Sequence, residues 1–354
     1  MSDPPLRPPA TLVVLFDGTL ASLSEGRRSN IGRIRALLSQ RRGGGPLRVH
    51  YAEGQQWEDW RALPDLALGS TMPGRIATAY GWLANSYQPG DRIFLFGYSR
   101  GAFAVRSLAG MIGRVGLLRP QAATERHIRL GWRYYQKGGS PSAIAAFRRR
   151  RCHPETPIQM IGCFDTVMAL GIRLPLLWLL TEPRYRFHDQ QLSPDVRFAA
   201  QALALDETRA AFQPILWASD GHPGIIRQTW FRGSHADIGG QLNGFDRARP
   251  LANNPLVWML EQAQEAGLPL PPDWRDDLPT DAGAPSVGSW RNWGKAFLLR
   301  APRTAGHDAS ESLHESVPRP YTGTAILTGA LKNESAPDRA TPLSPERPRR
   351  KARG

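Results

Sequence analysis

Apolar residues occur along the chain in short uninterrupted runs, and stretches with helical spacing lie between them. Runs that are rich in β-branched and aromatic residues and end at turn residues are typical of buried strands. Strands are therefore predicted at Leu12–Phe16, Val49–Ala52, Arg92–Phe96, Ile158–Phe164 and Ile225–Phe231.

Several of the intervening stretches have the periodicity of amphipathic helices. Helices are predicted over Asn30–Leu38, Arg75–Tyr87, Ala102–Gly113 and Pro255–Gly267. Strands that alternate with helices predict an α/β fold, with helices on both faces of a mostly parallel sheet. Right-handed crossovers place the loops that follow the strands along one sheet edge, so we expect the chemistry there.

Composition changes along the chain predict its domain boundaries. We expect a flexible N-terminus over residues 1–10, one α/β domain over 11–331 and a disordered basic tail over 332–354. The tail is polar and proline-rich, with few residues that could stabilise a folded state. Long insertions are predicted at Gly54–Gly74 and Leu268–Gly288, where glycine, proline and polar residues accumulate.

The chain is strongly basic. Its 354 residues carry a formal net charge of +14, and much of the excess lies in Arg148–Arg151 and Arg347–Arg353. These runs are typical of a solvated helix face and a disordered end, and the overall charge favours peripheral contact with an anionic membrane. No aromatic-interleaved module of the RNA-binding kinds is present in the sequence, so no nucleic acid partner is expected.

Cysteine content and apolar segments bear on the cell compartment. Cys152 and Cys163 are too few for a disulfide framework and have no partners at metal-ligand spacing.

Residues Met1–Pro5 lack the features of a secretory signal, so we expect the protein in the cytoplasm of the producing cell. The apolar segment Leu174–Leu180 is far shorter than the roughly 20 residues of a membrane span and is predicted to be a core helix or a lid.

A candidate nucleophile lies in Gly97-Tyr98-Ser99-Arg100-Gly101, between a predicted strand and a predicted helix. A sharp turn at this point holds the serine in a strained conformation with an exposed hydroxyl, and the glycines leave room for close packing. The start of the helix directs backbone N–H groups at a developing oxyanion. The alternative is a purely structural Gly-Ser turn.

A serine hydroxyl needs a base within hydrogen-bond distance, and that base is oriented by a carboxylate. Among the histidines that follow Ser99, only His235 comes directly after an apolar strand, and His314 is the second choice. Asp165 directly follows the predicted strand Ile158–Phe164. Its carboxylate is therefore expected at the same sheet edge as Ser99. The sequence thus predicts the order serine, aspartate, histidine.

Two other aspartates compete for the role of the acid. Asp206 is predicted to be helical, where it caps the helix or pairs with Arg209. Asp237 is adjacent to His235 and is the residue expected to hold the loop that carries this histidine. Asp165 is preferred because its position after a strand matches the position that the triad requires.

The sequence Asp17-Gly18-Thr19 follows the first predicted strand and admits two interpretations. Phosphatases of the haloacid dehalogenase type carry a nucleophilic aspartate two positions earlier, but this chain has Leu15 there. Gly18 or Thr19 is therefore expected to donate a backbone N–H to an oxyanion hole, together with the N–H of Arg100. Asp17 itself is expected to support the site or simply to tie down the loop.

These motifs form a wider pattern with several others along the chain. The pattern comprises Phe16–Thr19, Asn30, Tyr51–Gly54, Gly90–Ala102, Phe164–Val167, Phe187–Asp189, Leu203–Glu207 and Trp230–Gly240. From about Leu12 to Tyr321 the chain resembles an uncharacterised α/β-hydrolase domain family that includes the phospholipase effectors of bacterial type VI secretion. The resemblance implies a triad of Ser99, Asp165 and His235.

The resemblance also implies ester hydrolysis of phospholipids, delivery to a target cell by contact-dependent secretion, and a cognate immunity protein or secretion component as partner. This chain departs from the family pattern at two places. Gln201–Ala204 stands where the family often has His-Ala-Leu-Ala, and Gln241-Leu242 replaces a glycine and an aromatic residue. Both departures concern the shape of the pocket and leave the triad unchanged.

We therefore expect a serine hydrolase that cleaves carboxylic esters through an acyl-enzyme, with a lipid or another acyl ester as substrate. No metal or organic cofactor is needed for this chemistry. Two alternatives stay open at this point: a soluble carboxylesterase or thioesterase, and a non-catalytic basic binding protein on the same fold.

Overall fold

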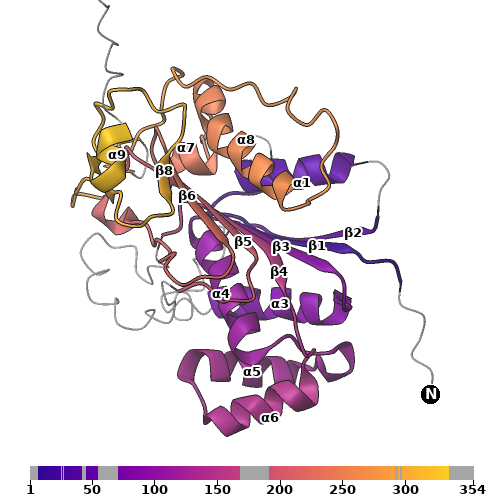
Figure 1. The fold of residues 1–354 in the computed structure, drawn as a ribbon. Coiled ribbons are helices and arrows are strands. Elements are labelled where there is room, and N and C mark those ends of the chain that lie inside the picture. Colours follow the sequence, from indigo (N-terminus) through magenta and orange to yellow (C-terminus); the bar gives the residue numbers. More distant parts are fainter. Residues whose placement is uncertain are drawn as a thin grey trace, which may run out of the picture.

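A seven-stranded parallel sheet forms the centre of the fold (Figure 1). The structure is a computed structural model and describes residues 7–24, 26, 28–41, 45–54, 71–167, 191–291, 294–295 and 297–334. The strand order is β2-β1-β3-β4-β5-β6-β8, and every pairing in it is parallel. The strands are β1 (Thr11–Phe16), β2 (Leu47–Ala52), β3 (Arg92–Tyr98), β4 (Ile158–Phe164), β5 (Phe198–Ala204), β6 (Ile225–Phe231) and β8 (Glu311–Leu313).

Helices cover both faces of this sheet (Figure 1). Helices α1 and α8 lie on one face, α3 and α4 on the other, and α5 and α6 pack against that second layer. This arrangement confirms the predicted α/β-hydrolase-like class. The helices are α1 (Asn30–Gln40), α3 (Thr71–Ser86), α4 (Arg100–Val115), α5 (Glu125–Lys137), α6 (Pro141–Arg151), α7 (His235–Gly239), α8 (Arg249–Glu265) and α9 (Gly329–Glu334).

The uninterrupted apolar runs are explained by burial on both faces of the sheet. Successive residues of a strand point to opposite faces. In β1, Leu12 and Val14 pack in the core beneath α3 and α4, whereas Val13 and Leu15 pack beneath α1 and α8. Each strand therefore contributes to two cores.

The strand order creates a crevice at one edge of the sheet. From β1 the chain crosses to β2 on one side and then returns to β3 on the other side of β1. The carboxyl ends of β1 and β3 consequently border a topological switch point, which is where ligands bind in open α/β sheets. Asp17 follows β1 and Ser99 follows β3 at this point.

The predicted strands and helices are present with small shifts of their ends, and two interpretations were wrong. Leu203–Asp206 is not helical, because Phe198–Ala204 forms the interior strand β5, which is buried along its whole length. The helix predicted from Pro255 begins at Arg249, so that proline lies within α8. The segment Leu268–Gly288 contains no helix or strand, as predicted.

Residues near both ends of the described chain make defined contacts. The Arg7 guanidinium pairs with Asp91 at 2.5 Å, and the Ala10 N–H donates to the same carboxylate. At the other end, α9 covers Gly329–Glu334, and its Leu331 is buried. The expected domain boundaries at residues 10 and 331 stay predictions. Leu174–Leu180 and Arg347–Arg353 lie outside the described residues.

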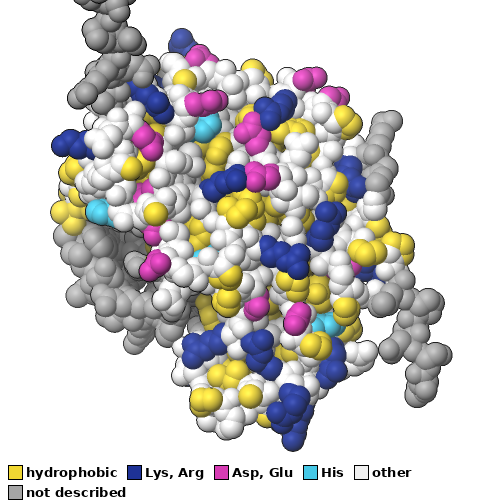
Figure 2. All heavy atoms as spheres, in the orientation of Figure 1, with side chains coloured by type: hydrophobic (Ala, Val, Ile, Leu, Met, Phe, Trp, Pro, Cys, Tyr) yellow, Lys and Arg dark blue, Asp and Glu magenta, His cyan; other side chains and the backbone are white. Residues whose placement is uncertain are grey.

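The described helices are all too short or too polar to cross a membrane. The basic run Arg148–Arg151 forms the last turn of α6, where cations interact favourably with the helix dipole. Figure 2 shows Lys and Arg side chains gathered over the part of the surface formed by α5 and α6. The predicted solvated basic face is therefore present at this run.

Candidate active site

Ser99 lies in the sharp turn between β3 and α4. Its φ is +57°, in the left-handed region that is costly for a residue with a side chain. The turn is held by the Ser99 N–H, which donates to the Phe164 carbonyl at 2.9 Å. The side chain does not cap α4, so its hydroxyl is available for another partner.

The two glycines beside Ser99 are required by close approach of the backbone. A Cβ on Gly97 would lie 2.4 Å from the Gly101 carbonyl oxygen, and a Cβ on Gly101 would lie 2.2 Å from the Phe16 carbonyl oxygen. Both distances are far below van der Waals contact. The Gly-x-Ser-x-Gly pattern thus lets α4 start directly against β1 and β3.

The structure brings the three residues of the predicted triad together. His235 Nε2 lies 2.9 Å from Ser99 Oγ, and His235 Nδ1 lies 2.5 Å from Asp165 Oδ2. Ser99 follows β3, Asp165 follows β4, and His235 begins α7 shortly after β6. The carboxyl ends of three parallel strands therefore supply one hydrogen-bonded row at the expected edge of the sheet.

Asp165 is fully buried and bound to a second cation, Arg303. The Arg303 guanidinium donates to Asp165 Oδ1 at 2.6 Å and to Oδ2 at 2.9 Å, and the Ala204 N–H also donates to Oδ1. Burial acts to raise the pKa of Asp165, but Arg303 and the hydrogen bond with His235 outweigh it and hold the pKa well below its usual value. Asp165 is therefore ionised at neutral pH.

Burial also determines the charge state of His235. Desolvation lowers the pKa of the imidazole, and the contact with Asp165 opposes this effect without overcoming it. The ring stacks against Tyr98 and meets the edge of Phe212, each with 4.9 Å between ring centroids. At neutral pH the imidazole is consequently neutral, which is the form that can accept a proton.

The Tyr98 ring packs between Gly18, in the turn after β1, and Gly239, in α7. A Cβ on Gly18 would lie 2.3 Å from the Tyr98 ring, and one on Gly239 would lie 2.0 Å from it. The Tyr98 hydroxyl donates to the His235 carbonyl at 3.3 Å. The ring thus fixes the separation between the turn after β1 and the short helix α7.

The turn after β1 is fixed by Asp17. This buried carboxylate accepts hydrogen bonds from the Gly18 N–H at 2.8 Å, the Ser29 hydroxyl at 2.5 Å and the Tyr51 hydroxyl at 2.9 Å. Burial raises the pKa of Asp17 to about 6, and these hydrogen bonds limit the rise. Asp17 therefore occupies a loop-fixing position. The N–H of Gly18 is already used by Asp17, which leaves the Thr19 N–H as the candidate oxyanion donor of this pair.

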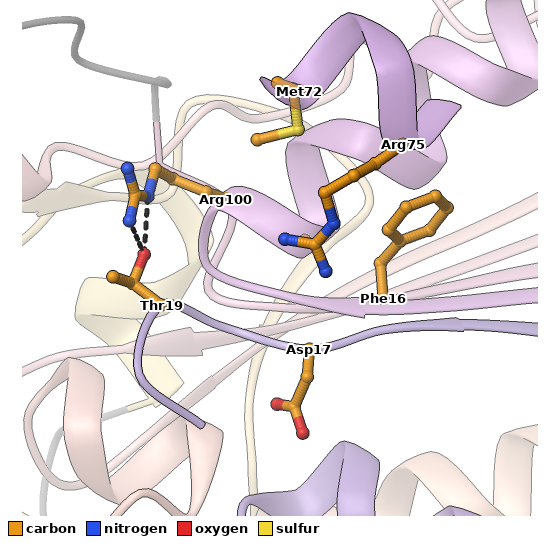
Figure 3. A pocket seen from close by; sticks show the side chains of 7 residues that line it. Phe16, Asp17, Thr19, Met72, Arg75 and Arg100 are labelled. Atoms are coloured by element: carbon orange, nitrogen blue, oxygen red, sulfur yellow. Dashed lines mark hydrogen bonds between the residues drawn. The ribbon is translucent and has the colours of Figure 1, made fainter. Parts of the chain in front are cut away.

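A pocket lies beside the nucleophile turn (Figure 3), and two arginines line it. The carboxylate of Asp17 points away from the Arg75 guanidinium, while Arg100 turns toward Thr19 (Figure 3). Thr19 Oγ1 accepts hydrogen bonds from Arg100 Nε at 2.5 Å and from its Nη2. The lining residues are Phe16, Asp17, Thr19, Met72, Arg75, Arg100 and Gly101.

Asp237 holds the segment that carries the histidine, as expected for it. Its carboxylate accepts hydrogen bonds from the Ser234 N–H and hydroxyl, both at 2.8 Å. It also accepts from the Ser286 hydroxyl at 2.6 Å and the Val287 N–H at 2.8 Å. Asp237 thus ties α7 to the loop that follows α8.

The alternative residues lie away from the hydrogen-bonded row. Asp206 follows β5 and accepts from the Gly233 N–H at 2.7 Å and the Tyr321 hydroxyl at 2.7 Å; its expected pairing with Arg209 is wrong, because Arg209 binds Glu207 instead. The His314 ring stacks on Phe231, and its Nδ1 lies 2.8 Å from the Ser316 hydroxyl. Neither alternative contacts Ser99 through a described hydrogen bond.

Sequence reasoning missed three residues that surround the row. Arg303 binds Asp165, and Glu207 accepts from the His235 backbone N–H at 3.2 Å while pairing with Arg209. The Asp-Glu pair at 206–207 was visible in the sequence. A prediction of the strand Phe198–Ala204 would have located Glu207 at the sheet edge that carries Ser99. Arg303 carries no signal, since it lies among proline and other basic residues of an irregular segment.

The described residues contain no cluster of three or more histidine, cysteine, aspartate or glutamate side chains that could hold a metal ion. Both cysteines are free and buried, and burial raises the pKa of Cys152 to about 11. Their thiols are therefore protonated at neutral pH.

Comparison with known proteins shows the family of this chain, and it finds similarity to a yeast protein and to a solved structure. Residues 10–262 match the family model described as the catalytic domain of Tle1-like phospholipase effectors of the type VI secretion system. The uncharacterized protein YEL023C of Saccharomyces cerevisiae is 32% identical over 164 residues, which cover 43% of this chain and 22% of the yeast protein.

A solved structure of the Tle1 effector bound to the VgrG spike of the type 6 secretion system is similar to this chain with a TM-score of 0.37 and 18% sequence identity. The similarity covers 66% of this chain and 51% of the Tle1 chain. This chain thus spans about a fifth of the yeast relative and about half of the Tle1 chain.

Proposed function

The chain belongs to the Tle1-like phospholipase effector family of type VI secretion, within its catalytic domain, and on this premise we propose that it is a serine esterase that hydrolyses membrane phospholipids. The observation that carries the proposal is the continuous row from Ser99 through His235 to Asp165, with contacts of 2.9 and 2.5 Å. Such a row is the arrangement that activates a serine hydroxyl.

The reaction proceeds in two steps. Neutral His235 accepts the proton of Ser99 as its oxygen attacks the ester carbonyl carbon, and the imidazolium is stabilised by ionised Asp165. The imidazolium then gives its proton to the departing alcohol as the carbon–oxygen bond breaks, which leaves an acyl-enzyme on Ser99. Water, deprotonated by the same histidine, releases the fatty acid and restores Ser99.

The negative charge that develops on the carbonyl oxygen requires backbone donors. The N–H of Arg100, the first residue of α4, and the N–H of Thr19 are proposed for this role. The first N–H groups of a helix have no partner within the helix and carry its positive dipole. Removal of one such donor commonly costs on the order of 100-fold or more in rate.

Two features favour phospholipid over neutral esters. The pocket beside Ser99 is lined by Arg75 and Arg100, whose guanidinium groups suit a phosphate. The family description names phospholipase effectors. A soluble carboxylesterase or thioesterase would use the same triad, but nothing in the site favours a substrate without phosphate.

The test combines active-site labelling with lipid analysis. A fluorophosphonate probe is expected to label the wild type, not Ser99→Ala, and the wild type is expected to release fatty acid from phosphatidylglycerol vesicles. Glu265→Gln serves as a control, because this carboxylate lies in an exposed ion pair with Arg227 and outside the row. A folded wild type that neither reacts with the probe nor hydrolyses lipid would refute the proposal and would favour a non-catalytic binding protein.

The family premise extends to delivery. We propose that the protein is made in the cytoplasm, exported by contact-dependent secretion and neutralised in the producing cell by an immunity protein. The related Tle1 effector is bound to a VgrG spike in its solved structure, so a spike protein is the proposed secretion partner here. Co-purification with a VgrG protein from the same genome tests this, and its absence would leave the esterase proposal unaffected.

A further inference from the structure

Exposed apolar side chains are concentrated in one segment near the C-terminal end of the described chain. Trp290 is 58% exposed, Leu298 is 76% exposed and Leu299 is 45% exposed. These three residues are called the apolar rim below. The Arg300 guanidinium lies 3.7 Å from the centroid of the Trp290 ring, so the tryptophan packs on the residue that directly follows Leu299.

The apolar rim is attached to the active site by aromatic contacts. Phe297 precedes Leu298, and its ring meets the Phe212 ring edge to face at 5.2 Å. Phe212 in turn meets the His235 ring at 4.9 Å. Two ring contacts therefore separate the rim from the histidine of the triad.

Backbone hydrogen bonds fix the same segment on the chain that follows β5. The Ala210 N–H donates to the Leu299 carbonyl at 3.0 Å, and the Ala301 N–H donates to the Thr208 carbonyl at 2.8 Å. Further along, Arg303 binds both oxygens of Asp165. The rim is consequently held in a fixed position relative to the triad.

The charged residues of the segment that carries the rim have one sign. Every charged residue from 286 to 303 is basic: Arg291, Lys295, Arg300 and Arg303. Arg291 and Lys295 are exposed, and Arg300 is half-buried beneath Trp290. Exposed leucine and tryptophan side chains with cations beside them are the composition of surfaces that lie in the interface of anionic membranes.

The size of the rim argues against a protein partner. A stable protein interface buries about 800 Å² on each side, which three side chains do not provide. Insertion into a lipid surface needs no matching shape, and its strength follows from the apolar area that leaves water together with attraction to anionic headgroups. The chemistry of the rim is therefore that of a lipid surface.

We propose that the apolar rim inserts into an anionic phospholipid bilayer and thereby presents the lipid ester to Ser99. This inference rests on the proposed phospholipase function. It assigns interfacial binding to Trp290, Leu298 and Leu299, which lie beyond the residues that match the family model.

The experiment compares Leu298→Ser/Leu299→Ser with the wild type. Binding to vesicles of phosphatidylglycerol and phosphatidylcholine is measured by sedimentation, and hydrolysis is measured on the same vesicles and on a soluble short-chain ester. The double substitution is expected to lower the vesicle partition coefficient and the vesicle activity about tenfold or more, because two leucine side chains no longer leave water. Activity on the soluble ester is expected to stay unchanged.

Ile225→Ser is the matched control. Ile225 is an exposed aliphatic residue, 46% exposed, at the amino-terminal end of β6 and so at the sheet edge opposite Ser99. This control is expected to bind and hydrolyse vesicles like the wild type.

Wild-type vesicle binding by the rim variant would overturn the proposal, as would an equal loss of activity on the soluble ester. A change in oligomeric state with the double substitution would also overturn it, because the occupant of the rim would then be a second copy of the chain. If the wild type hydrolyses neither substrate, the proposed function fails, while the binding measurement still tests the rim by itself.

Discussion

Replacement of Arg303 by glutamine tests whether this buried cation lowers the pKa of His235. The Arg303 guanidinium and the His235 imidazole bind the same carboxylate, Asp165. In the wild type, Asp165 therefore interacts with two groups: the permanent cation of Arg303 and the imidazolium of His235, which forms only during the reaction. Without Arg303, the whole charge of Asp165 is available to the imidazolium.

The magnitude follows from the arrangement of these charges. The Arg303 guanidinium and the His235 ring both bind Asp165 Oδ2. Two cations on one carboxylate oxygen are about 5 Å apart, and at an effective dielectric constant of about 20 they repel each other by about 3 kcal/mol. Relaxation of the surroundings removes part of this repulsion. The pKa of His235 is therefore expected to rise when the Arg303 charge is lost.

The assay is the pH dependence of kcat/KM on a soluble ester for the wild type, Arg303→Gln and Arg303→Lys. A higher pKa of His235 moves the acid limb of the profile to higher pH in Arg303→Gln, so its activity falls at pH 6 and persists at pH 9. Arg303→Lys keeps the charge and is expected to keep the acid limb near that of the wild type.

Loss of a buried ion pair also costs stability, by about 3–5 kcal/mol. Circular dichroism and urea unfolding therefore accompany the kinetics, and only the folded fraction is compared. A folded Arg303→Gln protein whose acid limb coincides with that of the wild type would refute the reasoning.

Three further predictions concern the turns of the site. Ser99→Gly is expected to be about 1 kcal/mol more stable to urea than Ser99→Ala, since glycine adopts φ +57° without strain; equal stability would contradict strain at this position. Gly101→Ala is expected to destabilise the protein by about 1–3 kcal/mol and to abolish fluorophosphonate labelling, because its Cβ meets the Phe16 carbonyl oxygen. A folded variant with wild-type labelling would show that this close approach is unimportant. The folded-state pKa of Asp17 is about 6, above its unfolded value, so the stabilising effect of its proton is present below about pH 4 and lost as the pH rises through 6. Urea unfolding between pH 4 and 7 is therefore expected to show a flatter pH dependence for Asp17→Asn, and parallel curves for variant and wild type would exclude this assignment.

The sequence identified the residues whose chemistry follows directly from a strand. Ser99 and Asp165 come immediately after apolar runs, and the carboxyl ends of parallel strands share one edge of the sheet. The geometry of these two positions was therefore predictable without any contact information. His235 was identified by the same rule together with the glycines on both sides of it.

The residues that the sequence did not reveal act through long-range contacts. The segment Leu203–Glu207, which begins at the end of β5, was taken for a helix because alanine and leucine have high helix propensity. Burial of β5 between β4 and β6 overrides that local preference. Arg303 lies 138 positions from Asp165, and its neighbours carry no periodic pattern. Such a contact depends on how an irregular segment returns to the sheet, which local patterns do not encode.

The position of Arg303 has a consequence for the synthesis of the protein. Ribosomes make the chain from its N-terminus, so the guanidinium that balances the buried charge of Asp165 is added after the serine and the histidine. In a nascent chain that ends before Arg303, the carboxylate of Asp165 lacks its guanidinium partner. Strand β8, at Glu311–Leu313, is then also absent from the sheet. The arrangement thus postpones assembly of the centre until residues 303–313 have been synthesised, and a product terminated before Arg303 would lack both elements.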